Sequence, residues 1–218
     1  GMADQQLDAE RSVNMEVGLR GKEGSLRYEA ALFRMDFDNQ IIPANSNTNF
    51  QKTNGGATLH QGIEGGLAWD MGSGFSLEAN ATWVPDAEFV GDRYAADGVT
   101  LTTPDGNRVP YTPEWVANVG LGYQAGGLRT LLSANHTGAQ YTDVLNTTAI
   151  QENLTGFFTG EVPAYTTWDL SGRYAVSPQL EVFGTVKNLA DKRYIASLRQ
   201  GIYVGPERSI DIGARYRF

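Results

Sequence analysis

The sequence contains few residues whose types and spacing suit catalysis or metal binding. His60 and His136 are the only histidines, and neither has another histidine, a cysteine or a carboxylate at a metal-ligand spacing. Cysteine is absent, which excludes disulfides and thiolate ligands. Serine, histidine and aspartate occur without the G-x-S-x-G pattern of a nucleophile elbow. We therefore predict no enzyme, no metal site and no bound cofactor.

Charged residues could be interpreted as catalytic pairs, but their pattern favours another explanation. The carboxylates in question are Glu16, Glu64, Glu78, Asp169, Glu181 and Asp211. Cations occupy the same alternating positions, at Arg20, Arg129, Arg173, Lys187, Arg215 and Arg217. Opposite charges on neighbouring strands stabilise a sheet. We therefore expect cross-strand charge pairs along one polar face.

Arginines and tyrosines in long polar connections are the candidates for ligand contact. They are Arg93, Tyr94, Arg108, Tyr141, Arg199 and Tyr203. A guanidinium can form paired hydrogen bonds to a carboxylate-bearing chelate, and a tyrosine can stack or donate. An ordinary solvated or loop-packing role is the alternative for each residue, and nothing in the connections identifies a ligand.

A hydropathy period of two identifies the elements that must position these side chains. Apolar and polar residues alternate over 75–83, and similar patterns cover 13–20, 63–69, 115–123, 128–134, 168–174, 180–187 and 209–218. Residues 26–32 begin in phase, and the pattern slips at Phe33, where we expect a β-bulge. Alternation is typical of strands with two different environments. We predict about nine strands and no helix.

Composition agrees with short alternating strands and excludes other classes of protein. The chain has 26 glycines and 11% aromatic residues. It has no apolar run of about 18 residues that could form a transmembrane helix. The formal net charge of −8 argues against a sequence-independent nucleic-acid surface, which needs clustered cations.

Tight and long connections alternate along the chain. The tight turns are GKEGS, MGSG, QAGG and VSPQ, and the long connections cover 40–56, 85–112, 140–163 and 190–207. Long structureless loops are uncommon in a compact soluble domain, whereas an outer-membrane barrel has short turns at one end and long loops at the other. Trp83, Trp115 and Trp168 lie near the long connections, while Phe75 and Tyr123 lie near tight turns. These positions match two interfacial aromatic bands, although a soluble β-sandwich core could also hold them.

Several motifs, taken in order, resemble the C-terminal part of TonB-dependent outer-membrane receptors. They are AERSVNMEVGLRG, ALFRMDFDNQI, RVPYTPEWVANVGLGY, VPAYTTWDLSGRY, VFGTVKNLADKRY and GPERSIDIGARYRF. The most diagnostic positions are Asn188, Leu189, Asp191 and Tyr194. Receptors of this family import ferric siderophores, ferric citrate, haem, cobalamin and some glycans.

The resemblance implies an all-β fold: an antiparallel up-and-down meander that forms the last nine or so strands of a 22-stranded transmembrane barrel. Short periplasmic turns and long extracellular loops would join the strands in the outer membrane of a Gram-negative bacterium. Ile210, Ile212, Tyr216 and Phe218 match the C-terminal signature that the outer-membrane assembly machinery reads. The chain would supply barrel wall, in contact with the lipid bilayer, and loops that bind a ferric siderophore or a related chelate.

The resemblance also implies a division of the chain. Residues 1–11 would comprise a tag-cleavage scar and the end of an extracellular loop, and residues 12–218 the C-terminal barrel part. The plug domain and the first barrel strands would be absent, so contact with TonB would run only through the missing plug segment. The alternative is a small self-contained β-barrel or sandwich that acts as a binding or adhesion module.

Overall fold

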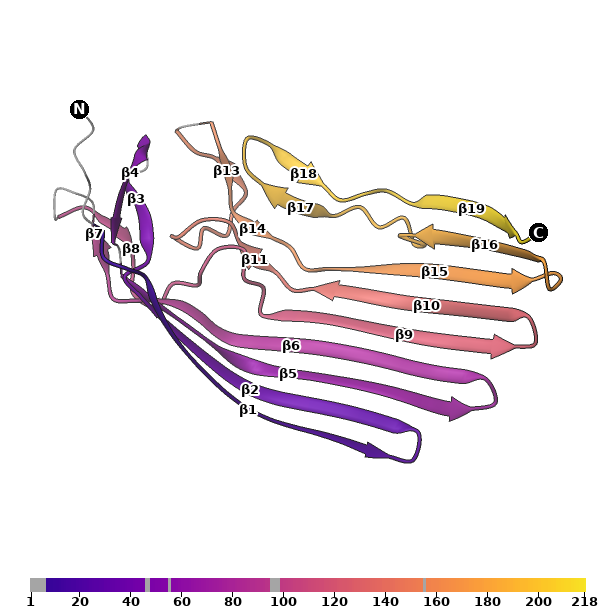
Figure 1. Ribbon diagram of the computed structural model, residues 1–218. Helices are drawn as coiled ribbons and strands as arrows, with labels where there is room; N and C mark the ends of the chain where they lie inside the picture. The colour runs from indigo at the N-terminus through magenta and orange to yellow at the C-terminus, as the bar shows by residue number, and fades with distance from the viewer. Residues whose placement is uncertain (1–6, 46–47, 55, 95–98, 155) are drawn as a thin grey trace.

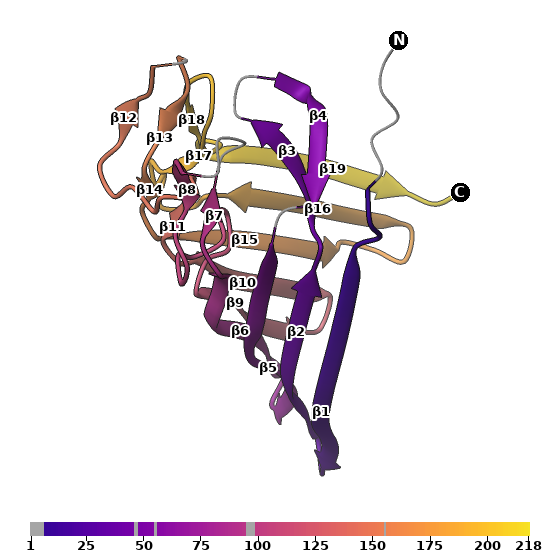
Figure 2. The same cartoon turned by 90° about the vertical axis from the view of Figure 1, so that its left-hand side faces the viewer.

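A computed structural model describes residues 7–45, 48–54, 56–94, 99–154 and 156–218. Nine long strands form one antiparallel sheet in chain order, which curves like part of a cylinder wall (Figures 1 and 2). The strands are β1 (Arg11–Glu23), β2 (Leu26–Asp38), β5 (Ala57–Gly72), β6 (Phe75–Val90), β9 (Trp115–Ala125), β10 (Leu128–Thr137), β15 (Tyr165–Ala175), β16 (Leu180–Lys187) and β19 (Ser209–Tyr216). No described segment is a helix long and apolar enough to cross a membrane. A single nine-stranded sheet contradicts the sandwich alternative, which needs two packed sheets.

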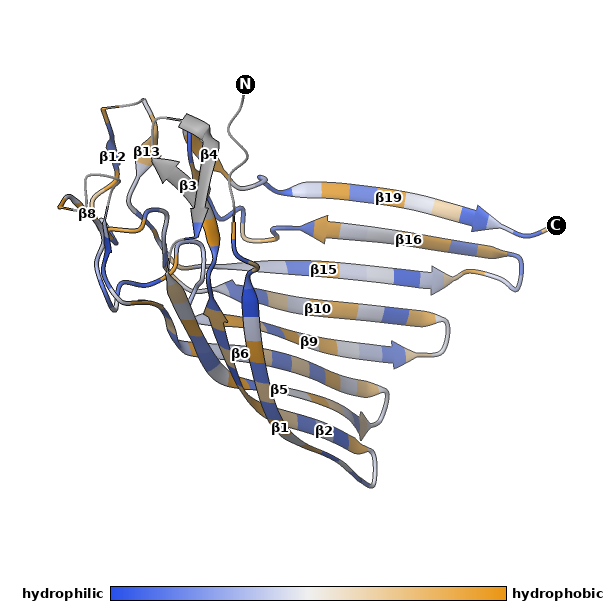
Figure 3. Cartoon of the chain, turned by 60° about the vertical axis from the view of Figure 1, so that its left-hand side comes forward, coloured by the Kyte–Doolittle hydropathy of each residue, from blue (hydrophilic) through white to orange (hydrophobic). Residues whose placement is uncertain are grey.

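The strand registers sort the side chains into two faces, as the alternation predicts. Hydrophobic and hydrophilic residues alternate along the long strands (Figure 3). The registers place most apolar residues on one face, called the outer face here, and most charged and polar residues on the other, the inner face. On the outer face, Trp83 pairs with Trp115 and their rings stack at 5.7 Å. At the other end of the same strands, Phe75 pairs with Tyr123, with ring centroids 4.6 Å apart. The outer face therefore has aromatic residues at both ends and aliphatic residues between them.

The long connections contain short strands that the sequence analysis did not predict. They hold the short strands β3 (Ile41–Asn45), β4 (Thr48–Asn54), β7 (Arg93–Tyr94), β8 (Leu101–Thr103), β11 (Gln140–Tyr141), β12 (Gln151–Glu152), β13 (Phe158–Thr159), β14 (Glu161–Val162), β17 (Ile195–Leu198) and β18 (Ile202–Val204). These strands pair two by two at one end of the sheet, and the four tight turns lie at the other (Figure 1). We call these ends the loop end and the turn end.

The bulge predicted at Phe33 is absent from the register. Phe33 pairs with both neighbouring strands without a shift, and the irregularity lies between Gln61 and Ile63, where β5 meets β6. Gly62 occupies that point, and a Cβ there would lie 2.2 Å from the Trp83 carbonyl oxygen. The hydropathy slip has another cause, since the outer face of β2 becomes polar beyond Leu32, where Arg34 and Asp36 form an ion pair of 2.9 Å.

The packed core lies at the loop end, between the last residues of β6 and the connections. Its buried apolar side chains are Ala87, Phe89, Val162 and Leu198. By contrast, outer-face residues of the sheet are exposed, with 68% of Val17 and 86% of Ile212 accessible. A sheet with one exposed apolar face is stable only against an apolar environment that covers it.

Candidate functional site

Tyr111 holds three connections together at the loop end. It follows Pro110 in the P-Y-T-P segment and adopts a left-handed backbone conformation, with φ of 57°. Its backbone N–H donates to the Tyr141 carbonyl at 2.8 Å, and its hydroxyl donates to the carbonyl of the buried Leu198. This tyrosine therefore joins the segment before β9 to β11 and β17, and fixes the arrangement of loops above the inner face.

Arg108, one of the predicted ligand contacts, binds backbone carbonyls. Its guanidinium donates to the carbonyls of Val84 at 2.6 Å, Thr112 at 2.8 Å and Pro85 at 2.9 Å. Its own backbone N–H and carbonyl pair with the side-chain amide of Asn146 at 2.6 and 2.8 Å. Burial lowers the pKa of Arg108 against the opposing effect of nearby acidic groups. The side chain thus fastens the irregular part of β6 to the P-Y-T-P segment.

Arg93 is 9% exposed and lies over the Phe89 ring, with its Cζ 4.5 Å from the ring centroid. One terminal nitrogen donates to the Ala57 carbonyl at 3.0 Å and to the Gln40 side chain at 3.3 Å. Burial lowers the pKa of Arg93. The cation–π contact and the carbonyl partly replace the water that this cation has lost. Arg93 therefore links the long connection at 85–112, to which it belongs, to the long connection at 40–56 and to the start of β5.

The other four candidates are spread over the loop end. Tyr94 and Tyr203 are 53% and 49% exposed, Tyr141 is partly buried, and Arg199 is exposed. The Arg199 carbonyl accepts a hydrogen bond from the Phe158 amide at 2.6 Å, which links β17–β18 to β13. Arg108 and Tyr141 interact electrostatically. The structure thus places all six near the loops, and a role in ligand contact stays a prediction for each.

A hydrogen-bonded chain of inner-face side chains joins three strands to the residue that follows a fourth, and sequence analysis missed it. Asn118 of β9 donates to Asn135 of β10, which donates to Asp169 of β15 at 3.1 Å. The other oxygen of Asp169 accepts the backbone N–H of Asn188, just after β16, at 2.8 Å. The detectable signal was the recurrence of amide and carboxylate side chains at matching alternation positions of successive strands. We call these four residues the inner polar chain.

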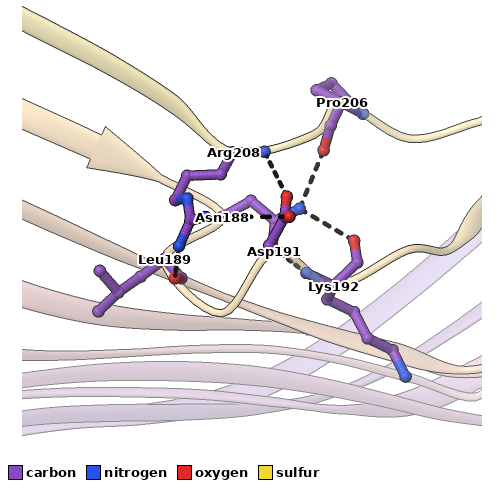
Figure 4. A network of polar contacts seen from close by, with 6 residues as sticks. All are labelled: Asn188, Leu189, Asp191, Lys192, Pro206 and Arg208. Carbon is purple, nitrogen blue, oxygen red and sulfur yellow. Dashed lines mark hydrogen bonds and ion pairs between the residues drawn. The ribbon is translucent and has the colours of Figure 1, made fainter.

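Asn188 continues the inner polar chain into the last long connection (Figure 4). It is 5% exposed, and its side-chain amide donates to the carbonyls of Lys192 at 2.9 Å and Pro206 at 3.0 Å. Its side-chain oxygen accepts the Lys192 amide at 2.8 Å, while Asp191 accepts the Arg208 amide at 3.0 Å. Both Asn188 and Asp191 have positive φ, of 49° and 50°. The diagnostic N-L-x-D segment is therefore a turn that binds the strand before it to the segment leading into β19.

Tyr194 packs beside this turn. Its ring stacks on Tyr165 at 4.1 Å, and its carbonyl accepts the Gly205 amide at 2.9 Å. Burial raises the pKa of Tyr194, helped by Tyr165 and by the carboxylate of Asp169. A Cβ at position 205 would lie 1.9 Å from the Tyr194 ring, so this position requires glycine.

The charge pairs expected on the inner face do not form. Among the described residues, ion pairs join Arg34 to Asp36 and Arg208 to Asp191. The first pair is on the outer face of β2, and the second lies between β16 and β19, so neither is on the inner face of the sheet. Glu181 and Arg215 are register partners without an ion pair, and Arg129 stands opposite Arg173. Opposite charges do stand across from each other at Glu181 and Arg215 and at Arg20 and Glu29, so the register agrees with the expected pairing at these positions, but their charged groups are not in ion-pair contact.

The sequence is similar to those of known outer-membrane receptors. The model of the family described as TonB dependent receptor-like, beta-barrel matches residues 2–189. The ferric enterobactin receptor PirA of Pseudomonas aeruginosa is 28% identical over 222 residues, which cover 98% of this chain and 26% of that protein. The probable TonB-dependent siderophore receptor PiuA of Acinetobacter baumannii is 25% identical over 197 residues, 88% of this chain and 24% of that protein. This chain thus spans about a quarter of the curated relatives it matches.

Solved structures share the fold. The unliganded ferric citrate transporter FecA superposes with a TM-score of 0.75 and 26% identity, over 94% of this chain and 31% of its own. The structure of PiuA from Acinetobacter baumannii gives a TM-score of 0.77 at 24% identity, over 99% of this chain and 30% of its own. The ferric yersiniabactin uptake receptor FyuA of Yersinia pestis gives 0.74 at 23%, over 97% of this chain and 30% of its own. The last two likenesses concern the fold alone.

Proposed function

We infer the function of this chain from its family: it belongs to the TonB dependent receptor-like β-barrel family, whose location is the outer membrane of Gram-negative bacteria. We propose that its nine long strands form part of the transmembrane wall of an active importer. The loop end would contribute to the extracellular binding surface for a ferric siderophore or a related iron chelate. The names of the relatives, which include ferric enterobactin receptors and a ferric citrate transporter, support that class of substrate.

The observation that carries the proposal is the two-faced sheet. Between Phe75 and Trp83, β6 presents apolar side chains outward and polar ones inward over nine residues. A tilted transmembrane strand needs about 9–11 residues. The exposed apolar face would meet lipid, and the polar face would line a lumen, because charges are tolerated there and are costly against lipid.

The division of labour within the longer receptor is part of the proposal. Residues 12–218 would supply wall and loops. Residues 1–11, of which 1–6 lie outside the described residues, would comprise a tag-cleavage scar and the end of a preceding extracellular loop. A plug domain and a TonB-contacting segment outside this chain would couple energy to transport. Ile210, Ile212, Tyr216 and Phe218 would present the terminal pattern to the outer-membrane assembly machinery, and the aromatic rings of Tyr216 and Phe218 lie 5.2 Å apart.

Iron uptake through the intact receptor tests the proposal. The receptor would be produced in a Gram-negative host that lacks its own ferric-chelate receptors, and uptake of radioactive iron would be measured with ferric catecholate and ferric citrate. We expect uptake of at least one chelate, and loss of uptake when TonB is deleted. A receptor that reaches the outer membrane but imports neither chelate, nor any other iron complex supplied, would refute the substrate class.

A further inference from the structure

Arg93 is a buried cation at the loop end, and no ion pair found among the described residues includes it. Burial alone lowers the pKa of Arg93. At Arg108, by contrast, the carboxylates of Glu114 and Asp86 oppose the effect of burial. A buried charge is costly unless it is paired. The burial of Arg93 therefore carries a cost that no carboxylate of the described part of the chain offsets.

The acidic residues closest to Arg93 in its own connection bind other groups. Asp92 directly precedes Arg93 in the sequence. Its carboxylate accepts the backbone N–H of Asp105 at 2.9 Å and the Tyr94 hydroxyl at 3.3 Å. The carboxylate of Asp105 accepts the backbone N–H of Gly91 at 2.6 Å. The hairpin of β7 and β8 thus uses these two carboxylates to fix its own conformation, and the guanidinium depends on other partners.

The guanidinium of Arg93 donates fewer hydrogen bonds than it could. One terminal nitrogen donates to the Ala57 carbonyl at 3.0 Å and, at 3.3 Å, to the Gln40 side chain. The buried Nε of Arg93 has no acceptor among the described residues. A Cβ at Gly56 would lie 2.5 Å from this Nε, so the backbone of the glycine packs against it. Buried polar groups nearly always have a partner, and an exception calls for an explanation.

We propose that Arg93 is an anion-binding residue that the described conformation holds away from the ligand, and that an anionic iron chelate draws its guanidinium out of this position. The groups that bind it are the carboxylate or catecholate oxygens of the chelate, so the inference rests on the proposed function. Paired, charge-assisted hydrogen bonds to such oxygens are stronger than the bonds that the buried guanidinium makes. Ligand binding therefore separates Arg93 from Gln40 and Ala57, and so loosens the contact between the long connections at 40–56 and 85–112.

The position of Arg93 permits this movement. Strand β7 has two residues, and its pairing with β8 is irregular between Arg93 and Tyr94. Tyr94 is 53% exposed, so the buried guanidinium belongs to a segment at the surface of the loop end. An arginine side chain has many rotamers. It can therefore turn toward a ligand while its backbone, whose carbonyl accepts the Thr102 hydroxyl at 3.0 Å, keeps its place.

Arg93→Met in the intact receptor separates a ligand role from a structural one. Methionine is unbranched, packs well on an aromatic ring such as that of Phe89, and has no charge to bury. A structural role predicts faster protease cleavage of the loops in this variant. We expect cleavage no faster than in the wild type, because removal of an unpaired buried charge offsets the lost hydrogen bonds. Tryptophan fluorescence quenching by ferric citrate and by a ferric catecholate should show at least tenfold weaker binding of the chelate that the receptor takes.

Arg193→Met is the matched control, because Arg193 is an exposed arginine of another long connection, the one at 190–207. It removes the same charge from the loop end without touching the buried position. An equal loss of affinity in this control would show a long-range charge effect and overturn the proposal. Unchanged affinity in Arg93→Met, or faster cleavage of its loops, would overturn it as well.

Hydrogen exchange of the Gln40 backbone amide measures the release, because this amide donates to the Gly56 carbonyl at 3.3 Å, beside the guanidinium. The anionic chelate should make this exchange several-fold faster in the wild type and leave it unchanged in Arg93→Met. Slower exchange in the wild type would mean that the ligand only covers the loops, and would refute the inference. Uptake separates the two proposals: import of an uncharged chelate alone would refute this inference, whereas import of no iron complex would refute the proposed function.

Discussion

Replacement of Asn188 tests whether its side chain fixes the turn at the start of the last long connection. Asn188→Gly is the cleanest change, because glycine adopts a φ of 49° without strain. It removes three side-chain hydrogen bonds, two donated to the carbonyls of Lys192 and Pro206 and one accepted from the Lys192 amide. The bond from its backbone N–H to Asp169 can persist. The variant therefore removes the side-chain hydrogen bonds and leaves the backbone conformation of the turn unstrained.

The expected magnitude follows from the number of bonds. Each neutral hydrogen bond contributes about 1 kcal/mol net, so Asn188→Gly should destabilise the closed turn by about 3 kcal/mol. Asn188→Ala loses the same bonds and adds about 1–2 kcal/mol, because a Cβ disfavours the left-handed conformation. The order of stability should be wild type, then glycine, then alanine.

Hydrogen exchange of the Lys192 amide is the direct measurement, since this amide donates to Asn188. A loss of 3 kcal/mol corresponds to roughly a hundredfold faster exchange, given that 1.4 kcal/mol is a factor of ten. Asn39→Gly is the matched control, because Asn39 has φ of 55° and its described contact is made by its backbone carbonyl. Unchanged Lys192 exchange in Asn188→Gly, or slower exchange in alanine than in glycine, would refute the reasoning.

Other changes test the loop end and the exposed sheet. Burial and the nearby cation of Arg108 lower the pKa of His60, so the folded state resists protonation of this side chain and should lose stability below about pH 6.5. His60→Gln should therefore make the unfolding temperature less dependent on pH. The same pH dependence in the variant and the wild type would contradict this. Arg108 reaches its three carbonyls with three different nitrogens, and the single ammonium of Arg108→Lys cannot occupy all three positions. Loss of two of the bonds should cost about 2 kcal/mol, seen as faster protease cleavage of the loops, and equal cleavage rates would contradict this. Gly205→Ala should displace the Tyr194 ring and lower the pKa of Tyr194 toward its usual value of 10, followed by ultraviolet absorbance against pH, and an unchanged pKa would contradict this. In buffer without detergent the chain should self-associate through its apolar face and free edges, and a monomer that unfolds cooperatively there would contradict this.

The architecture of the sheet could be predicted because period-two alternation is a local property. The pattern at 75–83 and 115–123 determines which side chains share a face, and the glycine-bearing turns determine that consecutive strands pair. The structure confirms nine long strands in chain order and aromatic residues at both ends of the outer face. The slip at Phe33 was misinterpreted as a β-bulge. A strand that leaves an apolar environment and a strand with an inserted residue both interrupt the alternation of apolar and polar residues.

The roles of single residues at the loop end could not be predicted, because they depend on atoms distant in the chain. Arg108 donates to carbonyls of residues 84 and 85, and Tyr111 donates to that of residue 198. Every residue has a backbone carbonyl, so the sequence does not distinguish an arginine that donates hydrogen bonds to carbonyls from an arginine that is available to bind a ligand. The short strands were missed for a related reason, since two-residue strands are too short to show a period.

The inner face shows most clearly what alternation leaves undetermined. Alternation placed Arg129, Arg173 and Glu181 correctly on one polar face, and opposite charges nearby suggested pairing. Register then decided the outcome, because a strand offset of two residues keeps the face and changes every cross-strand partner. Here the register sets arginine opposite arginine. The same register sets Glu181 opposite Arg215, so like and opposite charges both stand across from each other on this face, and alternation alone cannot distinguish the two arrangements.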